Sequence, residues 1–284
     1  MITQEKSVVK VIDSFIQCER DKNRSEGTLK AYSRILNEFN NWLNSNGGSI
    51  ENITRIDVQQ YIKSLELRNN SAVTIENKFA IISLFAKFLN RPEVVQHIRK
   101  PEHRKSFHTA PKSLERNERN RILREVEQSK NLRNVAIVNL LLCTGVRVSE
   151  LAALNRDDIT INERSGSVSI RNGKGNIARK VPLPVEARLH LTKYLNSRDD
   201  FEQALFISNY KKRITVRSVQ RILEKYNVHS HQLRHTYCRE LIGAGVDIVT
   251  VAELAGHADI NVTRRYANPS FSELGQIIDK AFSL

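Results

Sequence analysis

The sequence predicts a mainly α-helical protein with one small antiparallel β element, divided into two units. Three observations lead to this prediction. Apolar residues recur at helical spacing through almost all of the first ninety residues. A stretch with three prolines and a basic run interrupts the pattern over 91–112. Helical patterns then resume, and only residues 168–183 alternate as a hairpin does. We therefore expect a helical unit at 1–90, a basic linker at 91–112 and an α+β unit at 113–284.

The N-terminal unit is expected to be a bundle of four amphipathic helices joined by short polar turns, because such a bundle buries all four apolar faces. The expected helices run from Val8 to the polar stretch at 21–23, from Ser25 or Thr28 to a stop at 46–48, from Asp57 to Leu67, and from Ser71 to Leu89.

The expected linker contains Pro92, Pro101 and Pro111 among several lysines and arginines. Prolines with a basic run are typical of an exposed connection. Two interpretations stay open, a solvated loop without a partner and a strap that follows phosphates. In the second unit, Val168 and Ile170 alternate with serines, a glycine-containing turn follows, and the chain returns to Leu183, which predicts a β-hairpin.

Charge points to the class of partner. The 284 residues include 45 Lys and Arg against 31 Asp and Glu, for a formal charge of +14 and a pI of about 9.8. Such a balance favours a polyanionic partner, with nucleic acid first and an anionic membrane surface second. Residues 1–112 carry +6 and residues 113–284 carry +8, so a polyanion could be gripped from two sides.

Three features indicate a cytoplasmic protein. Cys18, Cys143 and Cys238 are odd in number and far apart, which suits reduced thiols better than disulfides. The N-terminus lacks the apolar region of a secretion signal. The most apolar stretch, Val135 to Val146, is too short to span a bilayer. We expect no membrane contact.

Two basic residues, Lys174 and Arg147, follow interruptions of the apolar pattern. Each could serve a functional site, and each also has a purely structural interpretation. Lys174 lies in a Gly-Lys-Gly turn that lacks the spacing and hydroxyl of a Walker A loop, so no ATP site is indicated. A lysine at a hairpin tip is otherwise a solubilising turn residue. Arg147 follows an apolar helix and a break at Thr144-Gly145, from which a side chain can point into a cleft. Its alternative is a surface arginine paired with Glu150.

The histidines suggest either a metal or a phosphate. His231 and His235 lie four apart, the spacing by which two imidazoles share a metal on one helix face. Gln232 stands where a metalloprotease has glutamate, so a metal site is the less favoured alternative. His231 and Arg234 lie three apart and project the same way from a helix, as recognition of a phosphate requires.

His257 precedes Tyr266 by nine residues. A tyrosine oxygen can attack a phosphodiester and store its energy in a phosphotyrosyl bond. In isolation, a tyrosine is more often a half-buried packing residue. Spacing alone does not decide between these interpretations.

Taken together, these segments resemble the tyrosine recombinase, or lambda-integrase-like, family. The first ninety residues are similar to its helical core-binding domain of the SAM-like type, so the likeness covers nearly the whole chain. Ser230 stands where the family often has proline. The segments that carry the likeness are Leu141 to Leu151 around Arg147, Gly173 to Asn176 with Val181-Pro182-Leu183, the box Ser230-His231-Gln232-Leu233-Arg234-His235, Leu254-Ala255-Gly256-His257, and Tyr266.

The resemblance implies a covalent mechanism. Tyr266 would attack the scissile phosphate, leaving a 3′-phosphotyrosyl link and a free 5′-hydroxyl. Phenols lose their proton near pH 10, so the nucleophile needs help, for which His231 is the candidate. Lys174 would protonate the leaving 5′-oxygen.

The remaining residues would hold the phosphate. The resemblance implies that Arg147 and Arg234 clamp its non-bridging oxygens, that His257 hydrogen-bonds it, and that Glu150 orients the site. With cations fixed in place, neither a metal nor a nucleotide nor another cofactor is implied.

The resemblance also implies double-stranded DNA as the partner, which would place the protein on the nucleoid. A homotetramer would bridge two sites, with a dimer on each, and an accessory DNA-binding protein is an open question. Residues 71–89 are the candidate groove helix. An apolar stripe from Phe271 to Phe282 would dock on its own unit or enter a neighbouring protomer.

Several alternatives for the function stay open. The chain resembles the short Xer type or a transposon-encoded resolvase, and its task could be integration, excision or resolution of cointegrates or dimers. One rival is a DNA-binding regulator that has lost the chemistry. The other is a type IB topoisomerase, which uses similar residues but relaxes supercoils as a monomer.

Overall fold

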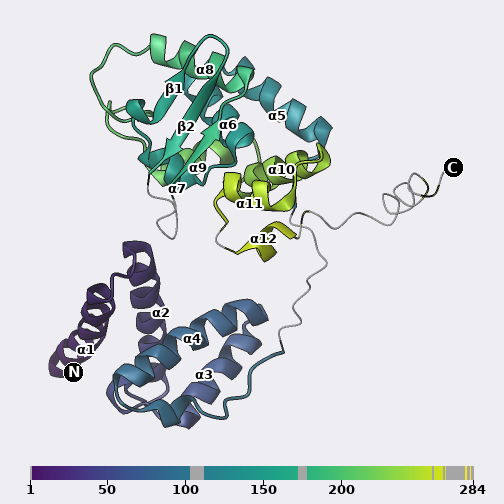
Figure 1. The fold of residues 1–284 in the computed structure, drawn as a ribbon. Coiled ribbons are helices and arrows are strands. Elements are labelled where there is room, and N and C mark those ends of the chain that lie inside the picture. Colours follow the sequence, from purple (N-terminus) through teal and green to yellow (C-terminus); the bar gives the residue numbers. More distant parts are fainter. Residues whose placement is uncertain are drawn as a thin grey trace. The chain divides into compact units, whose positions relative to one another are not determined.

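The computed structural model describes residues 2–102, 112–171, 178–257, 259–264, 266, 279 and 282, with side chains from residue 11 onward. The chain forms two compact units, Met1–Lys105 and Ser106–Leu284 (Figure 1). Each is described by itself.

The N-terminal unit contains the four expected helices. Helices α2, α3 and α4 each begin at a hydroxyl side chain that accepts from a backbone N–H of the first turn. Their core is aromatic, with Phe15, Phe39, Tyr61 and Phe85 fully buried. The helices are α1 Ile2–Asp21, α2 Glu26–Ser45, α3 Arg55–Leu67 and α4 Ala72–Phe88, and two 3-10 turns cover Ile50–Asn52 and Pro92–Val95.

This unit continues past the expected boundary at residue 90. Val94 is buried, and Arg99 and Gln59 exchange two hydrogen bonds of 2.8 and 3.1 Å. Lys100 lies 3.0 Å from Glu76 of α4. The first part of the expected linker is therefore packed on α3 and α4, because it carries an apolar residue and polar partners for both helices. Residues 103–111 lie outside the described residues.

The C-terminal unit is built around α6. This helix is buried along almost its whole length and packs against α5, α8 and α10. The helices are α5 Arg116–Gln128, α6 Leu132–Thr144, α7 Val148–Ala153, α8 Val185–Asn196, α9 Val216–Glu224, α10 Ser230–Gly243, α11 Ile248–Ala255 and α12 Ile260–Arg264. A 3-10 turn covers Arg156–Asp158.

A three-stranded antiparallel sheet completes this unit, in the order β1-β2-β3. The predicted hairpin is formed by β2 Gly166–Ile170 and β3 Arg179–Pro182, with Val168 opposite Val181 in the core. Strand β1, Ile159–Ile161, was not predicted, because three residues are too few to show alternation. The turn that holds Lys174 lies outside the described residues.

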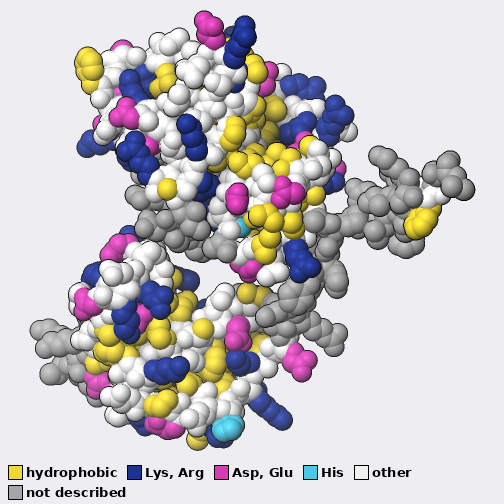
Figure 2. All heavy atoms as spheres, in the orientation of Figure 1, with side chains coloured by type: hydrophobic (Ala, Val, Ile, Leu, Met, Phe, Trp, Pro, Cys, Tyr) yellow, Lys and Arg dark blue, Asp and Glu magenta, His cyan; other side chains and the backbone are white. Residues whose placement is uncertain are grey.

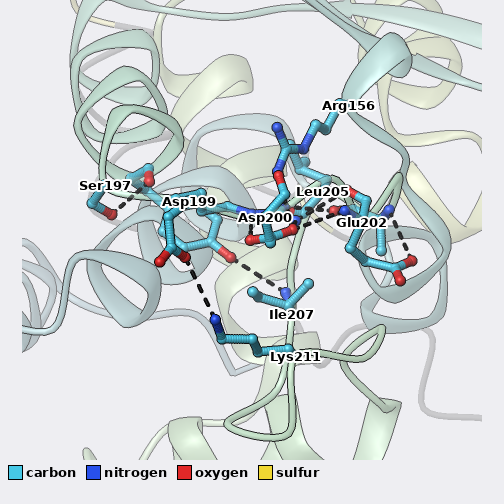
Figure 3. Close-up of polar contacts among 11 residues, drawn as sticks. Arg156, Ser197, Asp199, Asp200, Glu202, Leu205, Ile207 and Lys211 are labelled. Atoms are coloured by element: carbon cyan, nitrogen blue, oxygen red, sulfur yellow. Dashed lines mark hydrogen bonds and ion pairs between the residues drawn. The ribbon is translucent and has the colours of Figure 1, made fainter.

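One buried arginine fixes the loop after α8. Arg198, whose side chain is 2% exposed, donates to both carboxylate oxygens of Asp200 and to three backbone carbonyls between residues 202 and 205. Arg156 reaches the same Asp200 from the turn before β1 (Figure 3). Hydrogen bonds from Arg198 hold the pKa of Asp200 well below its ordinary value, and those bonds raise the pKa of Arg198.

The apolar stripe expected between Phe271 and Phe282 lies outside the described residues except for Phe282, whose side chain is exposed. Among the described parts of the chain, no helix has the length and apolar character that crossing a membrane requires.

Candidate active site

Arg147 is positioned by the end of α6. The helix stops at Gly145, which adopts a left-handed conformation with φ of 60°. A Cβ there would lie 2.3 Å from the ring of Tyr237, so only glycine fits. Two residues later, Arg147 is the N-cap of α7, and its backbone N–H donates to Glu150 at 2.8 Å. Its guanidinium bonds the other Glu150 oxygen at 2.8 Å and the Gly256 carbonyl at 2.6 Å.

Glu150 is shared with a second arginine that sequence reasoning missed. Arg179, at the start of β3, forms a bidentate pair with Glu150 at 3.1 and 2.8 Å and donates to the Leu254 carbonyl at 3.0 Å. Its side chain is only 8% exposed. A Cβ on Gly256 would lie 2.7 Å from this guanidinium, so the glycine lets the end of α11 close over it. Nothing in the sequence pattern marks Arg179 as buried.

Arg234 is buried with one donor group unused. It lies on α10, is 4% exposed, and donates from one Nη to the Gly145 carbonyl at 2.6 Å. Its other terminal nitrogen, Nη2, has no hydrogen-bond partner among the described residues. Buried polar groups are normally paired, so an unused guanidinium nitrogen inside a protein calls for an acceptor that comes from elsewhere.

The cluster carries more positive than negative charge. Burial, followed by the charge of Arg147, lowers the pKa of Arg234 to about 10, so the group remains charged near neutral pH. Burial alone would raise the pKa of Glu150, but hydrogen bonds from Arg179 and Arg147 outweigh it and hold that pKa below its ordinary value. One carboxylate therefore faces three arginines.

His257 closes the cluster on the α11 side. It directly follows Gly256, and its Nδ1 lies 2.7 Å from the hydroxyl of the buried Thr263. Burial, then the charges of Arg234 and Arg147, lower the pKa of His257 to about 4. The imidazole is therefore neutral at physiological pH.

Two further expected residues, His231 and Tyr266, each lie against His235 of α10. Tyr266 is half-buried, and its hydroxyl is hydrogen-bonded to Nδ1 of His235. His231, one turn earlier, is exposed, and its ring stacks with that of His235 at a centroid distance of 6.3 Å. Among the described residues, no group of three or more His, Cys, Asp or Glu could hold a metal.

The structure thus gathers most of the predicted residues in one place. Arg147 and Glu150 pair directly, Arg234 and Arg147 interact electrostatically, and both act on His257. Tyr266 joins through His235, which also interacts electrostatically with His257. Such a cluster can bind an oxyanion between two guanidinium groups with a phenol beside it. Lys174 lies outside the described residues.

Comparisons with known proteins identify the family to which both parts of the chain are similar. Residues 112–273 match the phage integrase family, and residues 12–93 match the N-terminal SAM-like domain of phage integrases. A tyrosine recombinase XerC of Lacticaseibacillus casei is 30% identical, over 90% of this chain and 92% of that protein.

Two solved structures share the fold. The crystal structure of XerH site-specific recombinase bound to its difH substrate has a TM-score of 0.68 at 19% identity, covering 92% of this chain and 81% of that one. The Tn1549 transposon integrase in complex with circular intermediate DNA has a TM-score of 0.72 at 19% identity, covering 96% and 99%.

Proposed function

This chain belongs to the phage integrase family and is a site-specific tyrosine recombinase, and we propose that the cluster around Arg234 is its active site, with Tyr266 as the nucleophile. The observation that carries the proposal is the buried Nη2 of Arg234, which has no acceptor among the described residues. A phosphate oxygen is the acceptor that a forked, charged donor fits best.

Arg147 and Arg234 would clamp the two non-bridging oxygens of the scissile phosphate. Both guanidinium groups are already held, Arg147 by Glu150 and the Gly256 carbonyl, and Arg234 by the Gly145 carbonyl. Fixed donors in a buried site stabilise the charge of a pentacoordinate transition state without reorganising. Glu150 would orient the arginines and not contact the phosphate, because its carboxylate already accepts hydrogen bonds from Arg147 and Arg179.

The covalent step would exchange one phosphoester for another. The Tyr266 oxygen bonds to phosphorus, its proton passes to a base, and the bond from phosphorus to the 5′-oxygen breaks. The resemblance assigns proton donation to that oxygen to Lys174, between β2 and β3. Because a phosphoester is retained, the exchange is near balance and needs no nucleotide, and the arginines supply the positive charge.

Neutral His257 would donate a hydrogen bond to the phosphate. When its Nδ1 accepts from the Thr263 hydroxyl, the ring proton lies on Nε2, which then serves as the donor. His231 lies exposed on the same helix as Arg234, three residues before it, where a phosphate can meet it. The phosphate would thus contact α7, α10 and the end of α11 at once.

DNA is the partner of this family, and we infer that both units of this chain bind it, since both are basic. On the N-terminal unit, α4 remains the candidate groove helix. Helix α2 offers a second candidate surface, a row of exposed polar side chains at helical spacing: Lys30, Arg34, Asn37 and Asn41. The lysine and arginine can bind DNA phosphates, and the asparagine amides can hydrogen-bond base edges. Binding to DNA would place the protein on the nucleoid.

We infer that the protein assembles as a homotetramer on two sites, with a dimer on each. Of the two docking modes that the sequence leaves open for the tail, we propose the one in which it enters the neighbouring protomer. Apolar side chains gather over α10 and α11 (Figure 2), where Leu241, Ile242 and Val246 are only partly buried and Val249 is 51% exposed. This surface fits an amphipathic tail. Deleting residues 271–284 should leave binding to one site intact and abolish synapsis of two sites, measured by gel shift and recombination. Undiminished recombination would contradict it.

The experiment that tests the active site uses a nicked suicide duplex cut from the DNA that flanks the gene. Wild-type protein should form a protein–DNA adduct on a denaturing gel, and Tyr266→Phe should bind the same duplex and form none. An adduct with the variant would remove Tyr266 from the mechanism. Binding without an adduct by the wild type would favour the regulator, and relaxation of supercoils by a monomer would favour the topoisomerase.

Integration, excision and resolution all use this chemistry. The Tn1549 integrase belongs to a transposon, and the relative from Lacticaseibacillus casei is a XerC tyrosine recombinase. We propose either setting for this chain. Whether an accessory protein takes part would be tested by recombination with purified protein alone.

A further inference from the structure

The structure places a histidine that no role above uses against the nucleophile. His235 Nδ1 is hydrogen-bonded to the Tyr266 hydroxyl, and the two ring centroids lie 5.5 Å apart with planes at 42°. His231, which the resemblance offers as the aid to deprotonation, is exposed and stacks with His235. The contact to the phenol therefore belongs to the second histidine of the box.

The geometry of this contact suits proton transfer. A general base must lie within hydrogen-bond reach of the proton that it takes. A neutral imidazole with its proton on Nε2 offers a lone pair on Nδ1, the atom that meets the phenol. The phenol loses its proton only near pH 10 when unaided, so at neutral pH an acceptor already in contact is a large advantage.

His235 lies next to the arginine that is proposed to bind the phosphate. Arg234 directly precedes His235 on α10, and His257 at the end of α11 lies close enough to His235 to interact with it electrostatically. A phosphate bound at Arg234 would bring negative charge beside His235, which favours the imidazolium that forms as the phenol ionises.

We propose that His235 is the general base of DNA cleavage, an assignment that rests on the proposed function. As the O–H bond of Tyr266 breaks, the proton moves to Nδ1 of His235 and the phenolate oxygen bonds to phosphorus. The bond to the 5′-oxygen breaks, and that oxygen takes a proton from the general acid. In rejoining, the 5′-hydroxyl gives its proton back to the general acid and bonds to phosphorus. The bond from phosphorus to the Tyr266 oxygen breaks, and His235 returns its proton to that oxygen.

Two variants separate a base from a residue that only positions the phenol. His235→Ala removes both functions. His235→Asn keeps a polar atom near the place of Nδ1, so it can still hold the phenol, but an amide does not accept a proton at neutral pH. Single-turnover cleavage of the suicide duplex at pH 7 should be about 10²–10³-fold slower in both variants. His229→Ala is the matched control, because it removes an exposed histidine at the start of the same helix that makes no side-chain cap.

Three readouts report the chemistry. The cleavage rate of His235→Ala should rise with pH where the wild type is level, because hydroxide then removes the proton. Added imidazole should restore part of the rate in His235→Ala and none in Tyr266→Phe. A duplex with sulfur in place of the 5′-bridging oxygen has a leaving group that needs no acid, so it should rescue Lys174→Ala and leave His235→Ala slow. Gel shifts confirm that every variant binds DNA.

The outcomes distinguish this proposal from the function beneath it. An adduct formed by Tyr266→Phe would overturn the proposed function itself. If the wild type forms an adduct and His235→Ala cuts at the same rate, only the assignment of His235 fails. Near-normal cleavage by His235→Asn beside a slow His235→Ala would make His235 a positioning residue and also overturn the base.

Discussion

Two buried arginines in the C-terminal unit have opposite surroundings. The side chain of Arg198 is 2% exposed, although the residue as a whole is only partly buried, and the whole of Arg234 is 4% exposed. Arg198 donates to three backbone carbonyls and to the carboxylate of Asp200, and its hydrogen bonds to that carboxylate raise its pKa. Arg234 has one carbonyl for one nitrogen, none for Nη2, and another arginine nearby, and its pKa is lowered.

The difference separates a structural arginine from one that waits for a ligand. Breaking a buried charge pair is costly, and a saturated guanidinium holds its loop in place. A buried donor without an acceptor costs stability in the free protein, and that cost falls when an anion binds. Similar burial therefore accompanies two functions, and the hydrogen-bond partners tell them apart.

The strongest test of this difference is a conservative substitution of Arg234, the arginine that has a donor without an acceptor. Arg234→Lys should slow single-turnover cleavage about 10³-fold, or about 4 kcal/mol, because an ammonium cannot make the fork. The burial and neighbouring charge that lower the pKa of Arg234 would also push the pKa of a lysine toward neutrality. Cleavage on the suicide duplex measures it, and near-normal turnover would contradict the clamp.

The same change at the saturated site should alter stability instead. Arg198→Lys should lower the free energy of unfolding by about 2–4 kcal/mol, because several buried acceptors lose their donor. Urea unfolding measures this loss. At a temperature where the variant is folded, its cleavage rate should equal that of the wild type, and a slower rate would mean that the loop after α8 serves the active site.

An anion should distinguish the two sites without any DNA. Inorganic phosphate at tenfold its dissociation constant should stabilise the wild type by about 1.4 kcal/mol, or a few degrees in Tm. Arg234→Gln should lose this gain and Arg198→Lys should keep it, which controls for the general effect of salts on burial. Equal gains in all three proteins would show that the phosphate does not bind at Arg234.

The smallest effect concerns pH. The pKa of His257 is lowered to about 4 in the folded protein, so the unfolded chain binds a proton at a higher pH than the folded one. The contribution to stability is complete above about pH 6.5 and is lost as the pH falls toward 4. His257→Gln should therefore show a flatter dependence of Tm on pH over this window, and an unchanged slope would mean that His257 titrates normally.

The helical bundle and the central hairpin were predictable because their information is local. Periodicity located all four helices, although α1 begins at Ile2 and not at Val8. Serine or threonine side chains mark where the other three begin. Strand β1 escaped notice because three residues show no period. The packing of residues 92–100 also escaped, because prolines and charges look the same in a free loop and in one held by α3 and α4.

The sequence by itself determined the chemistry that is available: two arginines and histidines at the start of α7, on α10 and at the end of α11, and a tyrosine that follows α12. Only the tertiary structure decided which of these side chains form hydrogen bonds and ion pairs with one another. Arg179 comes to Glu150 from a strand 29 residues away, and His235 meets a tyrosine 31 residues along the chain. Such contacts depend on the packing of α6, α10, α11 and β3 together, and no local pattern records whether a buried donor has found its acceptor.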